Sequence, residues 1–360
     1  MTPSVGSFRH VLAIETSCDD TSVAIVRNDG FVCDQKSATK DMDHAPFGGI
    51  VPEIASRNHS LFLLSLVDQL MKNSQIVIDG VAVTNRPGLV GSLIVGLMVA
   101  KTFAFSKNLP FVGVNHLEGH LFAADLFDSQ MSEEEAQLQR SQLRFPILAL
   151  AVSGGHSIIY EISKHGRYRV VGQTVDDAAG EAFDKFGKMM GFGFPGGVRV
   201  DRASLGGDKN KFYFPRGLIN EDTCNLSFSG LKSAADRLLS TFKPEEILLN
   251  EKDLCASFQW AIVEVLLSKV KMGISKVGAK SLLVTGGVSA NSLLRRTFLD
   301  WAKANGFEIK FPPLRYCTDN AAMIGLAGIS KLNQGFQDRF DLPCSPNSYQ
   351  EDFGLFNEFK

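Results

Sequence analysis

The feature that most constrains the fold of this chain is a pattern of apolar and small residues that occurs twice. Residues 11–26 (VLAIETSCDDTSVAIV) and residues 147–162 (ILALAVSGGHSIIYEI) each contain an apolar run, a short polar turn and a second apolar run. Apolar runs on either side of a tight turn are typical of a β-hairpin. Small residues in such a turn also let backbone N–H groups face an anion, although a plain hairpin turn explains each copy alone equally well.

A second pair of similar segments follows the two hairpins. Residues 78–97 (IDGVAVTNRPGLVGSLIVGL) and residues 279–298 (AKSLLVTGGVSANSLLRRTF) each indicate an apolar strand that ends in Val-Thr, a glycine-containing loop and a helix. The order is therefore hairpin, strand-loop-helix, hairpin, strand-loop-helix. This order predicts an α/β fold of two duplicated lobes, with related loops facing each other across a nucleotide cleft.

The length of the chain agrees with two lobes. It has 360 residues, and a compact domain usually contains about 150. We place the boundary in the polar segment 128–144, which lacks a strand pattern. We expect residues 1–130 to form the N-terminal lobe and residues 145–318 the C-terminal lobe, with the terminal segment 319–345, which begins as a helix, completing the first lobe.

Composition narrows the class of protein. A net charge of -2 does not indicate a dedicated nucleic-acid binder, so such a role would need a local basic face. A cation-rich stretch is one candidate, and an ordinary solvated surface explains it equally well. This stretch comprises Lys164, Arg167, Arg169, Lys185, Lys188, Arg199, Arg202, Lys209, Lys211 and Arg216.

Other features favour a reduced compartment without a membrane span. The 6 cysteines are scattered, without a C-x-x-C pair, which fits free thiols better than a disulfide scaffold. We recognise no secretion signal or transit segment at the N-terminus. The most apolar segment, residues 91–108, is interrupted by Lys101 and is short for a membrane span, so we expect a buried helix there.

Two histidines, His116 and His120, lie four residues apart in a segment with a helical pattern, NHLEGHLFAADL. Positions i and i+4 share one face of a helix, so both imidazoles can reach one cation, although packing or capping is the commoner role of such a pair. Glu118 projects roughly 200° around the helix from His116. The segment therefore lacks the H-E-x-x-H arrangement of zinc peptidases.

Asp319 offers the carboxylate that would complete a metal site. In FPPLRYCTDNAAMIGLAG it follows a proline-rich loop and precedes an alanine-rich helix, where Thr318 or Asp319 would also be a suitable N-cap. Two imidazoles and one carboxylate leave coordination positions open for water or substrate. This mixed set of nitrogen and oxygen donors suits iron or zinc.

The stretch DDAAGEAFDKFGKMMGFGFPGGVRVDRAS contains candidates for nucleoside binding. Asp184 lies in a short predicted helix, and Asp201 is expected to open the helix after a glycine- and proline-rich loop. Carboxylates accept hydrogen bonds from ribose hydroxyls, and Gly196 and Gly197 allow the main chain to lie against a base or sugar. An ordinary helix surface is the alternative interpretation of Asp184.

The second strand-loop-helix unit adds Asn291, which we expect in the first turn of its helix, after Gly286 and Gly287. A polar side chain in this place is associated with nucleotide contacts in α/β folds. The chain has neither a P-loop nor a G-x-G-x-x-G fingerprint, so a nucleotide would have to bind through the duplicated-lobe scheme.

Taken together, ten motifs resemble the bacterial and organellar TsaD family, which makes threonylcarbamoyladenosine in tRNA. In chain order they are ETSCDDTSVAIV, FGGIVPEIASRNHS, NRPGLVGSLIVGL, VNHLEGHL, VSGGHS, DDAAGEAFDKFGKMMG, FPGG, FSGLKSA, TGGVSAN and CTDNAAMIG. They span residues 11 to 330 or so. The resemblance implies the two-lobed fold shared by actin, hexokinase and the seventy-kilodalton chaperones (the ASKHA fold), with an interlobe nucleotide cleft.

The resemblance also implies an activity. Members of the family are acyltransferases that move the threonylcarbamoyl group of threonylcarbamoyl-AMP to the exocyclic amine of the adenosine beside the anticodon, in tRNAs that read ANN codons. By the family pattern, His116, His120 and Asp319 are ligands of one divalent metal ion, for which we favour Fe²⁺ over Zn²⁺. The positions that correspond to donor-binding residues are Ala151, Val152, Ser153, Gly154, Gly155, Asp184, Gly197, Asp201 and Asn291.

The first hairpin turn holds three further candidates, Glu15, Ser17 and Cys18, which could orient the reacting group. None of them receives a firm catalytic role from the sequence. Cys18 as a covalent nucleophile is disfavoured, because no histidine can be paired with it.

The resemblance further implies partners. They are tRNA, the donor threonylcarbamoyl-AMP and, in bacteria, an inert TsaB-like paralogue that dimerises with this subunit, a TsaE-like ATPase and the separate enzyme that makes the adenylate. We expect no membrane partner. We expect a bacterial, cytoplasmic protein, or a mitochondrial one if a transit peptide had been removed.

Three alternatives remain open. A kinase of small metabolites would share the fold, but it would need a catalytic Asp and a magnesium ion held by oxygen, which the histidine pair does not suggest. A metal peptidase would need a general base where Glu118 does not point. The third alternative is a non-catalytic assembly subunit that only binds nucleotide.

Overall fold

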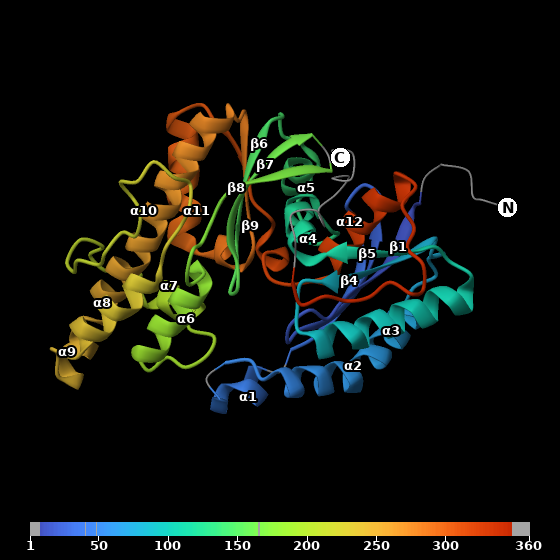
Figure 1. Cartoon of the computed structure of the whole chain (residues 1–360), viewed down its shortest axis with the longest axis horizontal. Coiled ribbons are helices and arrows are strands. Elements are labelled where there is room, and N and C mark those ends of the chain that lie inside the picture. The colour runs from blue at the N-terminus through green and yellow to red at the C-terminus, as the bar shows by residue number, and fades with distance from the viewer. Residues whose placement is uncertain (1–7, 40, 48, 165, 348–360) are drawn as a thin grey trace. The chain divides into compact units, whose positions relative to one another are not determined.

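The structure is a computed structural model that describes residues 8–39, 41–47, 49–164 and 166–347 (Figure 1). The chain forms two compact units. Unit 1 comprises Met1–Gln142 and Pro312–Lys360, and unit 2 comprises Leu143–Phe311. Residues 312–318, which we expected in the C-terminal lobe, group with unit 1. The nucleotide cleft expected between the lobes stays a prediction.

The core of unit 1 is a five-stranded sheet with the strand order β3-β2-β1-β4-β5. Its strands β1 and β2 form the first predicted hairpin, while β1 pairs with β4, and β4 with β5, in parallel. The strands are β1 (His10–Glu15), β2 (Thr21–Arg27), β3 (Val32–Ala38), β4 (Gly80–Arg86) and β5 (Phe111–Asn115).

Helices cover both faces of this sheet because side chains alternate along each strand. Leu12 and Ile14 of β1 pack with α2 (Pro52–Asn73) and α3 (Val90–Lys107) on one face. Val11 and Ala13 pack with α12 (Ala321–Asn333) on the other (Figure 1). The shorter helices of unit 1 are α1 (Asp41–His44), η1 (Ala45–Phe47), α4 (His116–Phe122), η2 (Ala123–Asp125), α5 (Glu133–Arg140) and η4 (Leu314–Tyr316).

Unit 2 repeats this design with a second five-stranded sheet, in the order β10-β9-β6-β7-β8. Strands β6 and β7 form the second predicted hairpin, and β9 pairs in parallel with both β6 and β10. The predicted duplication is therefore confirmed strand by strand. The strands are β6 (Ile147–Val152), β7 (Ser157–Lys164), β8 (Arg167–Gln173), β9 (Ser281–Thr285) and β10 (Glu308–Lys310).

The core of unit 2 is completed mainly by the long helix α10, whose buried face includes Phe258 and Ile262, and by Phe183 and Phe186 of α6. The phenyl rings of Phe186 and Phe258 stack with their centroids 3.9 Å apart. The helices of unit 2 are α6 (Ala179–Met189), α7 (Gly197–Ala203), α8 (Ser229–Leu239), α9 (Pro244–Leu249), α10 (Glu251–Val277), η3 (Gly287–Ala290) and α11 (Ser292–Ala304).

Helix α3 differs from the buried helix that we expected. Leu93 and Leu97 are buried against the sheet, but Ile94 and Met98 on its other face are exposed. By length and composition α3 could cross a membrane, which is weak evidence because the core helix of a soluble protein passes the same test. Because α3 has apolar residues on all sides and packs on the sheet with only one of them, some of its apolar side chains stay exposed.

Candidate metal centre

The site begins at the carboxyl edge of the sheet in unit 1, where three adjacent parallel strands end. Glu15 is the last residue of β1, Thr84 lies near the end of β4, and His116 directly follows β5. Because parallel strands end at the same edge of a sheet, three segments distant in sequence deliver polar side chains to one place.

Helix α4 begins at this edge and carries both histidines. The side chain of Asn115 accepts a hydrogen bond of 2.9 Å from the backbone N–H of Leu117, which caps the helix start. His116 and His120 lie one turn apart, as predicted, with their ring centroids 4.8 Å apart and the ring planes at 83°. Both imidazoles are buried.

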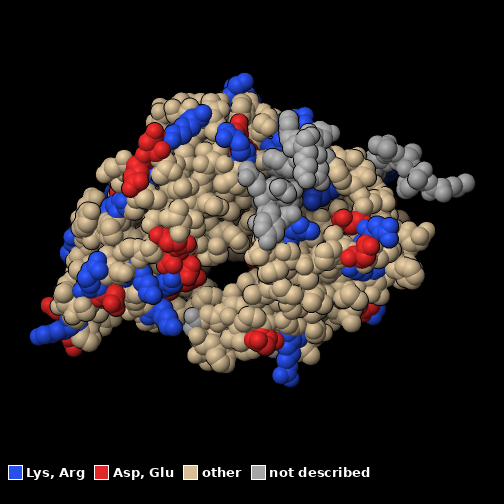
Figure 2. Space-filling model, viewed as in Figure 1, with Lys and Arg blue, Asp and Glu red and all other residues tan. Residues whose placement is uncertain are grey.

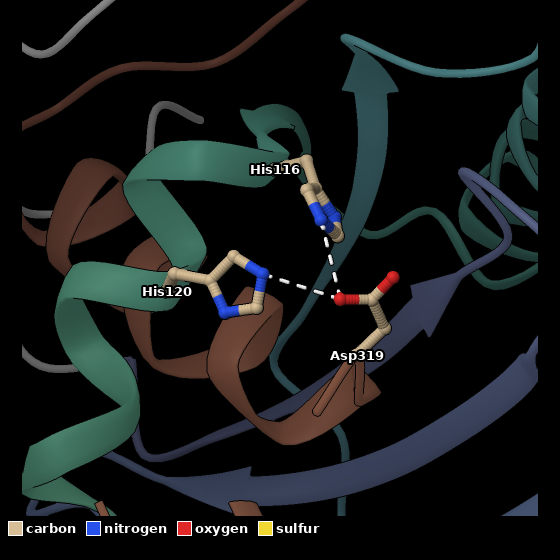
Figure 3. A group of neighbouring side chains, drawn as sticks. All are labelled: His116, His120 and Asp319. Carbon is tan, nitrogen blue, oxygen red and sulfur yellow. Dashed lines mark ion pairs between the residues drawn. The ribbon is translucent and has the colours of Figure 1, made fainter. Parts of the chain in front are cut away.

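Asp319 reaches the two histidines from the segment just before α12 (Figure 3). Its Oδ1 lies 3.4 Å from Nε2 of His116 and 3.2 Å from Nε2 of His120. The alternative role of Thr318 or Asp319 as the N-cap is wrong, since Asn320 is the N-cap and accepts a hydrogen bond of 2.9 Å from the N–H of Met323. Asp319 is thereby left to face the histidines.

The distances fit a metal ion. The ligand atoms of the three side chains lie within 4.8 Å of one another. Two donor atoms that each bind a cation at about 2.1 Å are expected roughly 3.0–3.5 Å apart, which matches both separations from Asp319. Oxygen and nitrogen lone pairs at this distance repel each other unless a proton or a metal ion lies between them.

Shifts in pKa show that the site is built for positive charge. Burial alone would lower the pKa of His116, but the carboxylates of Asp319 and Glu15 raise it well above its ordinary value. Burial alone would raise the pKa of Asp319, but the two histidines hold it well below its ordinary value. A cation is therefore favoured between these groups, whether it is a proton or a metal ion.

Glu118 points away from this centre. Its carboxylate is buried, and Oε2 lies 3.3 Å from Nζ of Lys331 on α12. Glu118 is therefore not available as the general base that a zinc peptidase would need. Its direction, away from His116, agrees with its position on the helix.

The first hairpin turn is held against the metal centre from two sides. Ser17 Oγ lies 3.1 Å from Nδ1 of His116, and the carbonyl of Ser17 accepts a hydrogen bond of 2.8 Å from the N–H of Leu89. Nε2 of His59, on α2, donates to the carbonyl of Cys18 at 2.9 Å. His59 could not be recognised from the sequence, because its contact with the turn depends on where α2 packs.

Cys18 does not have the surroundings of an activated thiol. Burial raises the pKa of its thiol far above the ordinary value, and the carboxylates of Asp19 and Asp319 raise it further. The thiol therefore stays protonated at neutral pH. A catalytic role for Glu15, Ser17 or Cys18 stays a prediction.

In unit 2, the predicted donor turn lies between β6 and β7. Ala151 and Val152 are the last residues of β6 and are buried. Ser153 donates its N–H to the carbonyl of His156 at 2.8 Å, and its Oγ accepts from the N–H of His156 at 3.2 Å. Gly154 and Gly155 form the exposed tip, with open space where a side chain would begin.

Asp184 organises the glycine- and proline-rich loop after α6. Its Oδ1 accepts hydrogen bonds from the N–H groups of Gly196 and Gly197, at 2.8 and 3.0 Å. Burial raises its pKa, and these hydrogen bonds oppose that shift. The carboxylate thus has a structural task that the sequence did not predict.

Asp201 and Asn291 meet around the start of α11. Asp201 accepts from the N–H of Ser292 at 3.0 Å and from its hydroxyl at 2.8 Å. Asp201 does not open a helix as expected, because α7 begins at Gly197. Asn291 is the N-cap of α11, one residue before the first turn where we expected it, and its Nδ2 donates to Oε1 of Gln259 at 3.0 Å.

The model of one protein family matches residues 31–326, and its description is "TsaD: tRNA N6-adenosine threonylcarbamoyltransferase". A protein of that name from Bdellovibrio bacteriovorus is 51% identical over 346 residues, which cover 95% of this chain and 99% of the relative. The chain belongs to the TsaD family. A relative of the same name from a Geobacter species is 46% identical, over 93% of this chain and 95% of that protein. Another from Streptococcus pneumoniae is 42% identical, over 94% of this chain and 97% of that protein.

Solved structures agree with the fold of the TsaD family. HypF from T. kodakarensis gives a TM-score of 0.57 at 12% identity, with 91% of this chain and 48% of that chain covered. Component A of (R)-2-hydroxyglutaryl-CoA dehydratase from Acidaminococcus fermentans gives a TM-score of 0.51 at 12% identity, with 91% and 99% covered. The predicted ASKHA fold is confirmed. As a TsaD-family protein the chain is a transferase, and the kinase and peptidase alternatives are not favoured.

Proposed function

We propose that this chain transfers the threonylcarbamoyl group of threonylcarbamoyl-AMP to the exocyclic amine of the adenosine beside the anticodon, in tRNAs that read ANN codons. One divalent metal ion, Fe²⁺ rather than Zn²⁺, would be held by His116, His120 and Asp319. The observation that supports this proposal most is the meeting of the three side chains at the carboxyl edge of the sheet, in a chain of the TsaD family.

In the proposed reaction the amine nitrogen of adenosine attacks the carbamoyl carbon, and AMP leaves. A divalent ion would polarise the donor oxygens and stabilise the negative charge that grows on them. The two imidazoles, whose Nε2 atoms lie 3.4 and 3.2 Å from Oδ1 of Asp319, would orient its carboxylate toward the ion. Ser17, whose Oγ lies 3.1 Å from Nδ1 of His116, would help to orient the reacting group.

We assign the binding of the adenylate to loops of unit 2. In the exposed turn of Ser153, Gly154 and Gly155, the backbone N–H groups of the two glycines would face the phosphate. Asp184 accepts a hydrogen bond from the N–H of Gly197 and would thereby hold the backbone of Gly197 in position to contact the nucleoside. Asp201 and Asn291 lie at the start of α11 and would provide further polar contacts to the adenylate.

The basic stretch of unit 2 gives little support to a large tRNA surface. Several of its cations form ion pairs within the chain, and on the face shown in Figure 2 basic and acidic side chains alternate. The pairs are Arg169 with Glu161, Lys185 with Asp177, Lys211 with Asp253 and Arg216 with Glu264. We therefore propose that companion proteins, including a TsaE-like ATPase, help to hold the tRNA.

We propose that the TsaB-like paralogue binds to the exposed apolar face of α2 and α3, which pack side by side. Leu61 and Leu64 are three residues apart on α2, and Ile94 and Met98 are four residues apart on α3, so each pair lies on one face of its helix. Leu64 is 65% exposed and Met98 56%. Such adjoining apolar faces are typical of protein interfaces. Since the relatives are bacterial, we place the complex in the cytoplasm.

The direct test is transfer in a defined mixture. The protein, loaded with Fe²⁺ and supplied with its companion proteins, is incubated with threonylcarbamoyl-AMP and unmodified tRNA, and the nucleosides are quantified by mass spectrometry. We expect threonylcarbamoyladenosine in this tRNA and none in a tRNA with guanosine at the same position. No modified nucleoside in either tRNA would refute the proposal.

A further inference from the structure

A second carboxylate, that of Glu15, lies behind the metal centre. Its Oε2 is 3.1 Å from Nδ1 of His116, the ring nitrogen that faces away from Asp319. Glu15 is 1% exposed. The imidazole of His116 is therefore placed between two carboxylates, one at each ring nitrogen.

This contact decides which nitrogen of His116 can bind a metal ion. An ionised carboxylate only accepts hydrogen bonds, so Nδ1 must carry the hydrogen and donate it toward Glu15, while Oγ of Ser17 is a second acceptor at the same distance of 3.1 Å. The lone pair of the neutral ring is then on Nε2, the atom that lies 3.4 Å from Asp319. A carboxylate that accepts this hydrogen bond fixes the orientation of the imidazole ring and makes the histidine a stronger metal ligand.

Glu15 is itself fixed by neighbours from the sheet and the turn. Oε1 accepts a hydrogen bond from the backbone N–H of Ser17, and Oε2 accepts one from the hydroxyl of Thr84. Both oxygens are thus engaged and shielded from solvent. This arrangement suits a group that orients another side chain, and it leaves Glu15 no access to a proton of the substrate.

We propose that Glu15, held by Thr84, is a positioning residue that fixes the tautomer of His116 and thereby sets the affinity of the centre for its metal ion. The inference rests on the proposed metal centre. It gives a function to two residues at the ends of β1 and β4 that are not among the three proposed metal ligands.

The test compares three variants of the full chain. Glu15→Gln keeps the size of the side chain but removes the charge, and its amide can donate as well as accept. Thr84→Val removes only the hydroxyl that holds Glu15. The matched control is Glu118→Gln, because Glu118 is also a buried carboxylate, on α4 between the two histidines, but its ion pair is with Lys331.

The first readout is the dissociation constant for Zn²⁺, measured by competition with a chromophoric chelator. We expect Glu15→Gln to weaken binding by about 10–100-fold and Thr84→Val by a smaller factor, while Glu118→Gln stays within about twofold of the wild type. If the wild type binds no Zn²⁺, the proposed metal centre itself fails. If the wild type binds Zn²⁺ and both Glu15→Gln and Thr84→Val bind it equally well, the role of Glu15 is refuted.

The second readout is NMR of the zinc-loaded protein with labelled histidine. In the wild type we expect His116 to carry its hydrogen on Nδ1, with a downfield proton resonance caused by the bond to Glu15. This resonance should move upfield in Glu15→Gln and stay in place in Glu118→Gln. An unchanged resonance in Glu15→Gln would overturn the inference. If Glu15→Gln does not fold, Thr84→Val decides the question by the same two readouts.

Discussion

Oδ1 of Asp319 lies 3.2 Å from Nε2 of His120, although the whole of unit 2 separates the two residues in the sequence. The contact depends on the close approach of α4 and α12. A Cβ atom at Gly119 would lie only 2.6 Å from Cδ1 of Ile324 on α12, which shows how closely the two helices approach at this glycine. The candidate metal centre is thus built by packing within unit 1.

The turn beside His116 should be sensitive to a single methyl group at Gly88. A Cβ atom there would lie 2.5 Å from the carbonyl oxygen of Ser17, and a backbone atom cannot easily move away. We predict that Gly88→Ala lowers the free energy of unfolding by about 1–3 kcal/mol and slows transfer, because it displaces the turn. Urea unfolding and the transfer assay measure the two effects.

The control for this variant is Gly230→Ala, in the exposed first turn of α8. Its new Cβ atom would meet only a side-chain atom of Pro215, at 4.0 Å, and alanine favours the helix. We expect unchanged or slightly higher stability and normal transfer. Equal behaviour of the two variants would contradict the importance of the contact between Gly88 and Ser17.

Gly154→Ala tests the donor turn without disturbing the fold. No atom lies within 4 Å of the new Cβ position, so the free energy of unfolding should not change. If the turn binds the phosphate of the adenylate, the methyl group will obstruct it. We predict a KM for threonylcarbamoyl-AMP that rises by about tenfold while kcat changes little, as expected for lost ground-state binding. A normal KM would remove this turn from the donor site.

The free energy of unfolding should depend on pH through the carboxylate of Asp176. Partial burial would raise its pKa, but hydrogen bonds from the hydroxyls of Ser227 and Ser229 and from the N–H of Phe228 hold it below 3.8. The stabilisation is therefore complete above the pKa of the unfolded chain and is lost as the pH falls through the lower folded value. Asp176→Asn should be less stable than the wild type at pH 6, and the difference should shrink below about pH 4. A difference that stays constant in urea unfolding from pH 6 to pH 3 would show that the carboxylate is not responsible.

The apolar face of α2 and α3 should lose its partner when it receives a charge. We predict that Leu64→Glu weakens binding of the TsaB-like paralogue at least tenfold, since a carboxylate would be buried in an apolar interface. Isothermal titration calorimetry measures this change. The control is Leu249→Glu on α9 of unit 2. Leu249 is 84% exposed, and its substitution should not affect binding of the paralogue. If Leu249→Glu is as damaging as Leu64→Glu, the face is not the interface.

The duplicated fold and the shared helix face of the two histidines could be predicted because their signals are local. A spacing of four residues places His116 and His120 on one face of a helix wherever that helix lies. The N-cap of α12 could not be predicted, because Thr318, Asp319 and Asn320 are all suitable caps and tertiary contacts choose among them. Glu15 and Thr84 were also missed as a pair, since only the order of β1 and β4 in the sheet brings them together.

The residues of unit 2 show the same limit. Glycines and carboxylates around Asp184 and Asp201 indicated a polar loop, but their partners follow from packing. Asp184 binds the loop backbone at Gly196, and Asp201 binds Ser292 at the start of α11. The exposed face of α3 could not be predicted either, because a helix with apolar residues on all sides does not indicate which side packs on the sheet.

The central claim is that His116, His120 and Asp319 hold one divalent cation on which transfer depends. The most direct test measures bound metal by elemental analysis and transfer rate in the same samples of the wild type, Asp319→Asn and the His116→Ala, His120→Ala double variant. We predict one metal ion per wild-type chain, and loss of both metal and transfer in the two variants although they remain folded. Full transfer by either variant without bound metal would contradict the claim.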